Sequence, residues 1–415
     1  MANEIITSTL LSEEVAAQFS VSNSFLATAN RKYDGMFQER TYKPGQTINI
    51  RLDNQHVVQR GNSATATELK ETWMPLQLQQ LFTVYEEYDT IDLTVSLGYE
   101  NWKKSVLKGM VNNIISQINA AIAADAKNSV YLTTGTPGTA LNTFGAINNP
   151  GIVLGKNGVQ FGTGWNHAMT FEDAGALKDA LSNSFNTTIN NEINRYSQLG
   201  HLSYFDIYEE SSIDRHQSYI GDYGAPVING AVTSGSTLVA AGFTGSITDI
   251  LRKGDTITIT HPTAQPYFVN RVTKVSTGQP VQFVVTADVT STAGGAATIP
   301  VGPEINISAD DPNQNISAEI PDGAVIKVTR KGTVADGEDG LSNINLAYSS
   351  SGLFAVCPPL ELLRGGDSDH YTDPETGWSV RVTLDGETGE SKNVIRIDVL
   401  CGWKWDPTQT VRNVS

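Results

Sequence analysis

The sequence predicts an α+β protein that carries a separate all-β module inserted into its chain. Three observations lead to this class: a long apolar helix pattern at residues 101–131, alternating strand patterns on both sides of it, and a change of composition to Gly, Thr, Ser and Val at about residue 228. With 415 residues the chain is long enough for two or three domains. Its 39% hydrophobic and 17% charged residues argue against disorder over the whole length.

The charge balance argues against a dedicated nucleic-acid reader. The chain has 28 Lys and Arg against 44 Asp and Glu, a net charge of -16, which repels phosphate backbones. A container that encloses nucleic acid loosely stays compatible with this balance. Two cysteines are too few for a disulfide framework and indicate a reducing compartment or a redox-indifferent role. Because there is neither a membrane-span pattern nor a signal-peptide pattern, we expect the product to stay in the cytoplasm or in something assembled there.

The first 100 residues predict a helical arm followed by extended ribbons. Leu11 and Val15 begin a modest helical spacing of apolar residues, and Ser12 is a candidate cap. This pattern predicts an amphipathic arm, with an ordinary first helix packed on its own domain as the alternative. Residues 46–52 and 91–97 alternate apolar and polar side chains, with a long polar stretch between them. Such ribbons predict a projecting hairpin, because the stretch between them is too polar to form a core.

The strongest helix pattern of the sequence follows these ribbons. One apolar side chain recurs every four residues, and neither proline nor a turn pair interrupts the series. The predicted buried stripe consists of Trp102, Val106, Met110, Ile114, Ile118 and Ile122. The helix should therefore pack along its length against the rest of the protein.

An α/β pattern and then a β-rich module occupy the middle of the chain. Thr170 and Asp173 resemble a capping box. The helix they open is expected to bury Phe171, Ala174, Leu177, Leu181 and Phe185. Seven short strand candidates lie between Ile228 and the acidic, glycine-rich linker 333–340, which predicts a self-contained barrel or sandwich. Alternating residues at 378–384 and 395–401 then predict an antiparallel hairpin of long strands.

Spaced motifs for catalysis or metal binding are missing from the sequence. The six histidines never form a close pair on one element, which argues against a metal site. Spacings at Asp311, Asn313, Asn315 and Asp322 echo a calcium loop, but Ile316 stands where that loop needs glycine, which favours a plain polar loop. Cys357 and Cys401 are expected to be small buried hydrophobic residues. We therefore expect no catalytic residue, no metal ion and no cofactor.

The order of these parts resembles the major capsid proteins of tailed bacteriophages with the Hong Kong 97 fold. The closest resemblance is to podovirus coat proteins that carry an inserted, telokin-like I-domain. The segments that carry it are KPGQTINIRL, NIISQINAAIAADAKNSVY, LRKGDTITI, LFAVCPPLELLRG and VIRIDVLCGWKWDPTQTVRN. Together they span nearly the whole chain; each motif alone is weak, and their order is the specific part.

The resemblance implies a division of the chain into named parts. They are an N-arm (1–40), an E-loop with flanking P-domain strands (41–100), a spine helix in the P-domain (101–131), a first A-domain part (150–227), an inserted β-barrel I-domain (228–335), a second A-domain part (336–377) and a P-domain hairpin with a C-terminal tail (378–415). Contacts between subunits are expected from the E-loop residues Gln59, Arg60, Glu68, Lys70 and Glu71.

The resemblance also implies a structural function without catalysis. Copies of the chain would form hexamers and pentamers of an icosahedral shell around double-stranded DNA, without sequence-specific binding, and the procapsid would mature by expansion. The expected partners are other copies, a scaffolding protein and a portal protein, and the family leaves room for a decoration protein. The location would be the virion, after assembly in the host bacterial cytoplasm, with no membrane. We expect a non-covalent shell, since no crosslinking site of the family can be matched here.

A second reading comes from another class of protein. The Thr- and Gly-rich β-module, together with aromatic residues such as Trp403 and Trp405 taken as exposed, is compatible with an adhesin-like, carbohydrate-binding tail protein.

Overall fold

The computed structural model describes most of the chain, in two compact units. The described residues are 8–22, 24–31, 47–52, 55–56, 58, 61–62, 69–78, 80–89, 107–162, 164–182, 200–330, 332, 340–373, 378–387 and 392–415. Unit 1 comprises Met1–Ile50, Met74–Ile122 and Leu353–Lys404, and unit 2 comprises Arg51–Trp73, Ala123–Gly352 and Trp405–Ser415.

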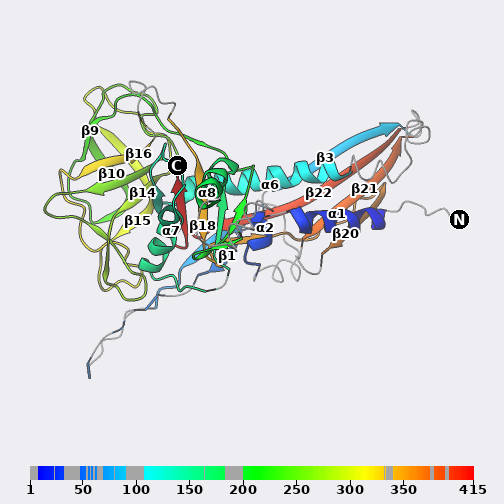
Figure 1. The fold of residues 1–415 in the computed structure, drawn as a ribbon, viewed down its shortest axis with the longest axis horizontal. Helices are drawn as coiled ribbons and strands as arrows, with labels where there is room; N and C mark the ends of the chain where they lie inside the picture. Colours follow the sequence, from blue (N-terminus) through cyan, green and yellow to red (C-terminus); the bar gives the residue numbers. More distant parts are fainter. Residues whose placement is uncertain are drawn as a thin grey trace. The chain divides into compact units, whose positions relative to one another are not determined.

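A sheet of long antiparallel strands dominates unit 1. The central strand β22 (Lys392–Trp405) pairs with β21 (Ser379–Glu387), and β21 pairs with β20 (Asp367–Thr372). On its other side β22 pairs with β3 (Gln80–Asp89) in continuous register from Lys392↔Asp89 to Cys401↔Gln80, and the short β19 (Leu353–Val356) also joins β22. Figure 1 draws these strands as neighbouring arrows. The hairpin predicted from alternation is confirmed: Val380, Val382, Ile395, Ile397 and Val399 are all buried.

Helices and a small ribbon complete unit 1. The helix α1 (Ser8–Ser22) packs on β20 and β21, and the amide of its first residue, Ser8, donates to Asp367 Oδ2 at 3.1 Å. A short α2 (Ser24–Thr28) follows. The strands β1 (Thr47–Arg51) and β2 (Trp73–Gln77) form a two-stranded sheet.

The predicted long helix is α6 (Lys108–Ser129), which continues from unit 1 into unit 2. Its buried positions repeat with helical spacing, while Asn112, Asn113, Ser116 and Gln117 between them are exposed. The spacing of apolar side chains therefore decides which face of this helix is covered.

Unit 2 contains a six-stranded sheet with two helices. Its order is β4 (Thr133–Gly135), β23 (Thr410–Val414), β18 (Ile344–Tyr348), β5 (Asn166–Met169), β7 (Phe205–Glu209) and β6 (His201–Leu202). The helices are α7 (Phe144–Lys156) and α8 (Phe171–Ser182). The C-terminal strand β23 pairs with β18 and β4, so it belongs to this sheet and not to the long-stranded hairpin with which the sequence reading grouped it.

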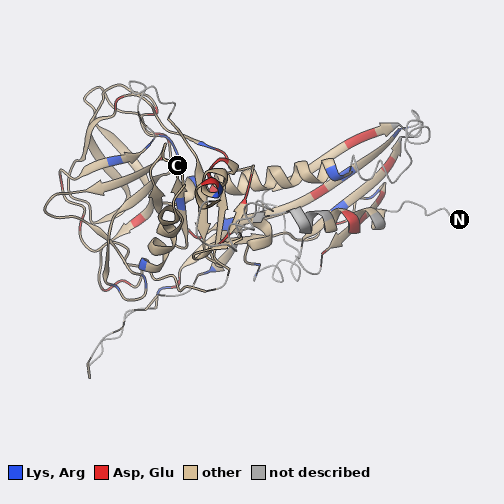
Figure 2. Ribbon diagram, in the orientation of Figure 1, with Lys and Arg blue, Asp and Glu red and all other residues tan. Residues whose placement is uncertain are grey.

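A closed barrel of six strands forms the other part of unit 2. Around the barrel the order is β10 (Ser234–Phe243), β15 (Ala297–Asn306), β14 (Gln282–Val285), β11 (Thr256–Thr260), β16 (Val325–Thr329) and β9 (Gly224–Ile228). A hairpin of β12 (Tyr267–Val269) and β13 (Ser276–Pro280) accompanies it. The barrel strands carry only two charged residues, Glu304 and Lys327, so they are almost entirely tan in Figure 2.

The chain enters and leaves the barrel region through two paired strands. β8 (His216–Gln217) precedes the barrel, β17 (Leu341–Ser342) follows it, and the two form an antiparallel pair. The barrel begins at Gly224, four residues before the predicted boundary at 228. Two of the seven strand candidates, ATIPV (297–301) and EINIS (304–308), are not separate strands, because β15 runs without interruption from Ala297 to Asn306.

One half of the predicted capping box is present at the start of α8, since the Thr170 amide donates to Asn345 Oδ1 at 2.8 Å and not to Asp173. Thr170 Oγ1 accepts a hydrogen bond from the Asp173 amide at 3.4 Å. Ala174 and Leu177 are buried as expected. Phe185 of the predicted buried face lies outside the described residues. Phe171, however, is 57% exposed, which corrects that assignment. It occupies the first turn of the helix, where an apolar residue can satisfy the periodicity without facing the core.

Candidate functional sites

The predicted packing stripe of the long helix lies in the interior where it is described. Met110 and Ile114 are each 2% exposed, and Ile118 and Ile122 are fully buried. Trp102 and Val106 lie outside the described residues. These apolar side chains offer packing and no reactive group, so a role for them is structural.

Two of the predicted E-loop contact residues form ion pairs within the chain. Lys70 Nζ lies 2.8 Å from Asp311 Oδ2, and Glu71 Oε1 lies 2.8 Å from Arg51 Nη2. The guanidinium of Arg51 also lies 6.0 Å from the ring centre of Trp73, which is 48% exposed. The remaining predicted contact residues, Gln59, Arg60 and Glu68, lie outside the described residues.

The outer edge of strand β3 is a feature that the sequence analysis did not single out. Among the strands described, only β22 forms a ladder with β3, so one side of this ten-residue strand has no strand partner. Two apolar side chains on it are exposed, Leu81 by 47% and Tyr85 by 63%. Their alternation in LFTVY was the available signal, since residues two apart in a strand share one face.

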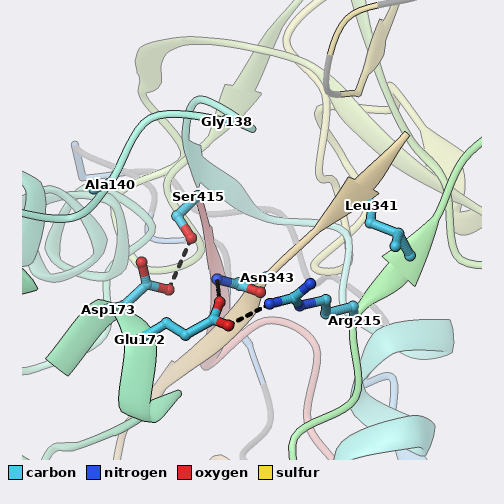
Figure 3. A pocket seen from close by; sticks show the side chains of 8 residues that line it. All are labelled: Gly138, Ala140, Glu172, Asp173, Arg215, Leu341, Asn343 and Ser415. Atoms are coloured by element: carbon cyan, nitrogen blue, oxygen red, sulfur yellow. Dashed lines mark hydrogen bonds and ion pairs between the residues drawn. The ribbon is translucent and has the colours of Figure 1, made fainter. Parts of the chain in front are cut away.

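A polar cavity of about 240 Å³ lies where β4, β17, β18, α8 and the C-terminal residues of unit 2 come together. Figure 3 shows its charged side chains. Arg215 donates to Glu172, and Asn343 Nδ2 donates to the same carboxylate at 3.0 Å. These bonds lower the pKa of Glu172, with Asn343 as the larger cause. Glu172 is therefore held as a carboxylate, which does not suit a general acid.

The second carboxylate of this cavity, Asp173, is 3% exposed and bonded from three directions. Its Oδ2 accepts hydrogen bonds from Asn345 Nδ2 at 2.7 Å, Ser415 Oγ at 2.8 Å and Thr170 Oγ1 at 3.0 Å. These donors come from β18, from the residue after β23 and from the residue before α8. Asp173 thus connects α8, β18 and the C-terminal end of β23 by hydrogen bonds, which indicates a structural role.

A buried His, Asp and Ser group at the base of the barrel has the wrong order for nucleophilic catalysis. His216 Nε2 and Ser218 Oγ both lie 2.7 Å from Oδ1 of Asp255, so the carboxylate and not the imidazole is the central member. The Arg252 amide donates to Asp255 Oδ2 at 2.7 Å. Burial lowers the pKa of His216 despite its bond to Asp255, which leaves the ring neutral at pH 7. This group closes the turn before β11.

The two cysteines are buried side by side in unit 1. The Cys401 thiol donates to Cys357 Sγ at 4.0 Å, and no disulfide joins the two. Burial, followed by the neighbouring thiol, raises the pKa of Cys401 well above its ordinary value. A thiol held protonated in this way is a poor nucleophile, in line with the expected packing role.

Metal binding finds no support in the described part of the chain. No three His, Cys, Asp or Glu side chains gather there in a way that could hold an ion. The residues whose spacing echoes a calcium loop have other partners: Asp311 pairs with Lys70, Asn315 bonds to the Asn306 amide, and Asp322 accepts from the Gly230 amide. Within the same described residues, no helix has the length and apolar character of a membrane span.

One side chain offered for the adhesin reading is placed differently by the structure. Trp405 is fully buried, with its ring edge-on to Tyr348 at a centroid distance of 5.1 Å. Trp403 is half-buried, with its ring centre 6.3 Å from that of Phe82. The expectation that both are exposed was wrong, and that reading loses part of its support.

No family model and no curated protein matches this chain. Solved structures with a similar fold include one titled "Mycobacterium phage Che8", with 13% sequence identity over 94% of this chain and 90% of that chain at a TM-score of 0.47. Another is the "Capsid of Ralstonia phage GP4", with 8% identity, 92% and 84% coverage and a TM-score of 0.43. A third is a "virus-like particle from Pyrococcus furiosus", with 7% identity, 97% coverage of both chains and a TM-score of 0.38.

Proposed function

We propose that this chain is a major capsid protein that self-assembles into the icosahedral shell of a tailed double-stranded DNA phage. The observation that carries the proposal is the outer edge of β3, ten residues long, with Leu81 and Tyr85 exposed on it. A long edge strand with apolar side chains is a liability for a lone protein, because it invites pairing with other chains. In a shell, a neighbouring copy covers such an edge.

The closed barrel supports the same proposal as an inserted I-domain. It lies in the chain between β8 and β17, which pair with each other, so both of its connections leave from one place. A module attached in this way can be added to a shell-forming body without a break in the body's sheet.

The charge of the chain fits a container for DNA. A net charge of -16 keeps a packaged polyanion from adhering to the wall, and no sequence-specific contact is needed. In this proposal hexamers and pentamers form around a scaffolding protein and a portal, in the cytoplasm of the bacterial host. Expansion then accompanies maturation, as subunits change between two packings of similar free energy.

The test is the size and form of the purified chain. Expressed alone and together with its scaffolding protein, it should form closed shells tens of nanometres across in negative-stain micrographs. Boiled in SDS, these shells should release only the 44.7 kDa monomer. Ladders of larger bands would contradict a non-covalent shell. A chain that stays monomeric under all these conditions would contradict the capsid function, and glycan-dependent retention of a trimer would favour the adhesin reading.

A further inference from the structure

We propose that one face of the barrel is an intrachain docking surface for the described residues of the segment 51–73 (51–52, 55–56, 58, 61–62 and 69–73), and that it sets how this segment is offered to a neighbouring copy. The docking surface consists of the loop 307–315, which follows β15, and of Lys274 in the turn between β12 and β13. Its second clause rests on the proposed capsid function. The first clause stands on contacts within unit 2 alone.

Polar bonds join the segment to the docking surface at three places. Lys70 Nζ donates to Asp311 Oδ2 at 2.8 Å, and Thr72 Oγ1 donates to Asn313 Oδ1 at 3.2 Å. On the other limb of the segment, Lys274 Nζ donates to Gln55 Oε1 at 2.7 Å. The docking surface thus binds the segment both near its beginning, at Gln55, and near its end, at Lys70 and Thr72. The limbs are also joined to each other, because the Leu52 amide donates to the Thr72 carbonyl at 3.0 Å.

The loop that receives Lys70 is built as a firm support. Gln314 Nε2 donates to the carbonyls of Ile307 and Ile316 at 3.1 and 3.2 Å, which closes the loop from inside. Asn315 Nδ2 fixes it to β15 through the Glu304 carbonyl at 2.6 Å. The Asn313 amide donates to Asp311 Oδ1 at 2.9 Å, so this carboxylate already points in a fixed direction before Lys70 binds to it.

Lys274, which binds Gln55 and Pro312, has a backbone conformation that is unfavourable for a residue other than glycine. Its φ of 56° lies in the left-handed region, which side chains other than glycine seldom adopt. The turn tolerates this because Asn270 Oδ1 accepts the amides of Val272 and Thr273 at 2.9 and 3.0 Å. Lys274 Nζ also donates to the Pro312 carbonyl, so it links the two parts of the docking surface to each other.

The contacts described between the segment and the docking surface are polar bonds, which can be broken and formed again. A cavity of about 290 Å³ lies beside Leu52, Gln55 and Thr72, and another of about 480 Å³ lies beside Gln55, His56 and Val58. Unfilled space removes much of the van der Waals attraction that a closed interface would add. Since Lys70 is 44% exposed, salt also screens its bond to Asp311.

The experiment combines charge reversal with hydrogen exchange in the full-length, unassembled chain. K70E and D311K should each raise the exchange rate of the amides at 69–73 several-fold, and the K70E/D311K double variant should bring it back toward wild type. The matched control is R215E, which breaks the ion pair of a cation with similar exposure, 46% for Arg215 against 44% for Lys70, with Glu172 elsewhere in unit 2. It should leave exchange at 69–73 unchanged. Equal exchange in wild type, both single variants and the double variant would overturn the docking surface.

Assembly is read out separately, so the two proposals can fail independently. If the wild type forms shells, K70E and D311K should lower the shell yield or change the shell size, with recovery in the double variant. Shells of unaltered yield and size in both single variants would overturn the second clause. Absence of shells from the wild type would instead count against the capsid function, while the exchange result still decides on the docking surface.

Discussion

Nε and Nη2 of Arg381 both donate to Oδ2 of Asp398, at 3.1 and 2.5 Å, inside the long-stranded sheet of unit 1. The Asp398 side chain is fully buried, and that of Arg381 is 8% exposed. Thr83 on β3 donates to the other oxygen of Asp398 at 2.7 Å, and Arg396 Nε donates to the same carboxylate at 2.9 Å. One carboxylate therefore connects β21, β22 and β3.

Replacement of Asp398 by Asn should destabilise unit 1 strongly. Arg381 would keep its charge in a buried place without a counter-ion, at a cost of ~3 to 5 kcal/mol in the free energy of unfolding. Urea unfolding followed by tryptophan fluorescence measures the change. The control is D385N on the neighbouring strand β21, where the carboxylate is exposed and a change below about 0.5 kcal/mol is expected. Equal stability of both variants would contradict the role of Asp398.

The same carboxylate should make unit 1 sensitive to acid. Burial alone raises the pKa of Asp398, but the bonds from Thr83, Arg381 and Arg396 outweigh it and hold the pKa below the ordinary 3.8. A carboxyl with a lower pKa in the folded state stabilises the fold above pH 3.8 and loses this contribution as the pH falls through the folded pKa. Between pH 5 and 3 the free energy of unfolding should therefore fall more steeply with falling pH in the wild type than in D398N. Urea unfolding curves measured at several pH values give this slope.

His167, in the middle of the six-stranded sheet, should destabilise unit 2 in mild acid. It is fully buried, neither ring nitrogen has a hydrogen-bond partner among the described residues, and burial lowers its pKa to about 3. Between pH 6.5 and 3, His167 is protonated in the unfolded chain but neutral in the folded chain. The free energy of unfolding therefore falls as the pH falls. At pH 5 the loss relative to neutral pH is about 2 kcal/mol.

The variant H167L should remove this part of the pH dependence. Urea midpoints at pH 7.5 and pH 5 compare it with wild type and with H370L, a control at an exposed histidine of β20. Only H167L should flatten the difference between the two pH values. The same slope in all three proteins would show that His167 does not titrate in this way.

Acidic residues in the stripe of α6 should block folding. I114D and I118D each bury an unpaired carboxylate, which costs several kcal/mol against a domain stability of ~5 to 15 kcal/mol. N113D and Q117D place the same charge on exposed positions of the same helix and should fold. Circular dichroism and solubility decide, and a soluble, assembling I114D/I118D protein would mean that the stripe is not a packing face.

Charges on the edge of β3 should stop assembly and leave the subunit folded. L81K and Y85K introduce lysine, which protects natural edge strands from pairing, so shell yield should fall at least tenfold. V239K, on a similarly exposed apolar residue of the barrel, is the control. Light scattering and electron micrographs give the yield, and the urea midpoint verifies the fold. Undiminished shells from L81K/Y85K would remove the main support for the proposed function.

Elements set by local periodicity could be predicted from the sequence. Alternation at Val380 and Val382 predicted buried strand positions, and the four-residue spacing through Ile114 and Ile118 predicted the covered face of α6. Both patterns arise because one face of a single strand or helix is buried along its length. Phe171 failed the same rule, because a single apolar residue at a helix end can lie on either side of the boundary between core and solvent.

Contacts between distant parts of the chain could not be predicted in this way. The strand β23 joins β4 across about 280 residues, as in the pair Asn413 and Thr134, and only the folded sheet makes them neighbours. Lys70 and Asp311 are 241 residues apart, and a lysine in a polar stretch carries no mark of its partner. The spacing at Asp311 and Asn313 resembles a calcium loop, but Ile316 favoured a plain polar loop there, and in the structure these side chains accept hydrogen bonds from a lysine and a threonine of the same chain.

The paired strands at the neck of the barrel have a mechanical consequence. Three successive residue pairs join these strands. From the barrel toward the six-stranded sheet of unit 2, they are Ser218 with Gly340, Gln217 with Leu341, and His216 with Ser342. Because both strands join the barrel to the rest of unit 2, a pull on the barrel acts on β8 and β17 in the same direction and is shared between them. The residue pairs hold the two strands together, so the connection should respond to tension as one double strand and not as two independent linkers.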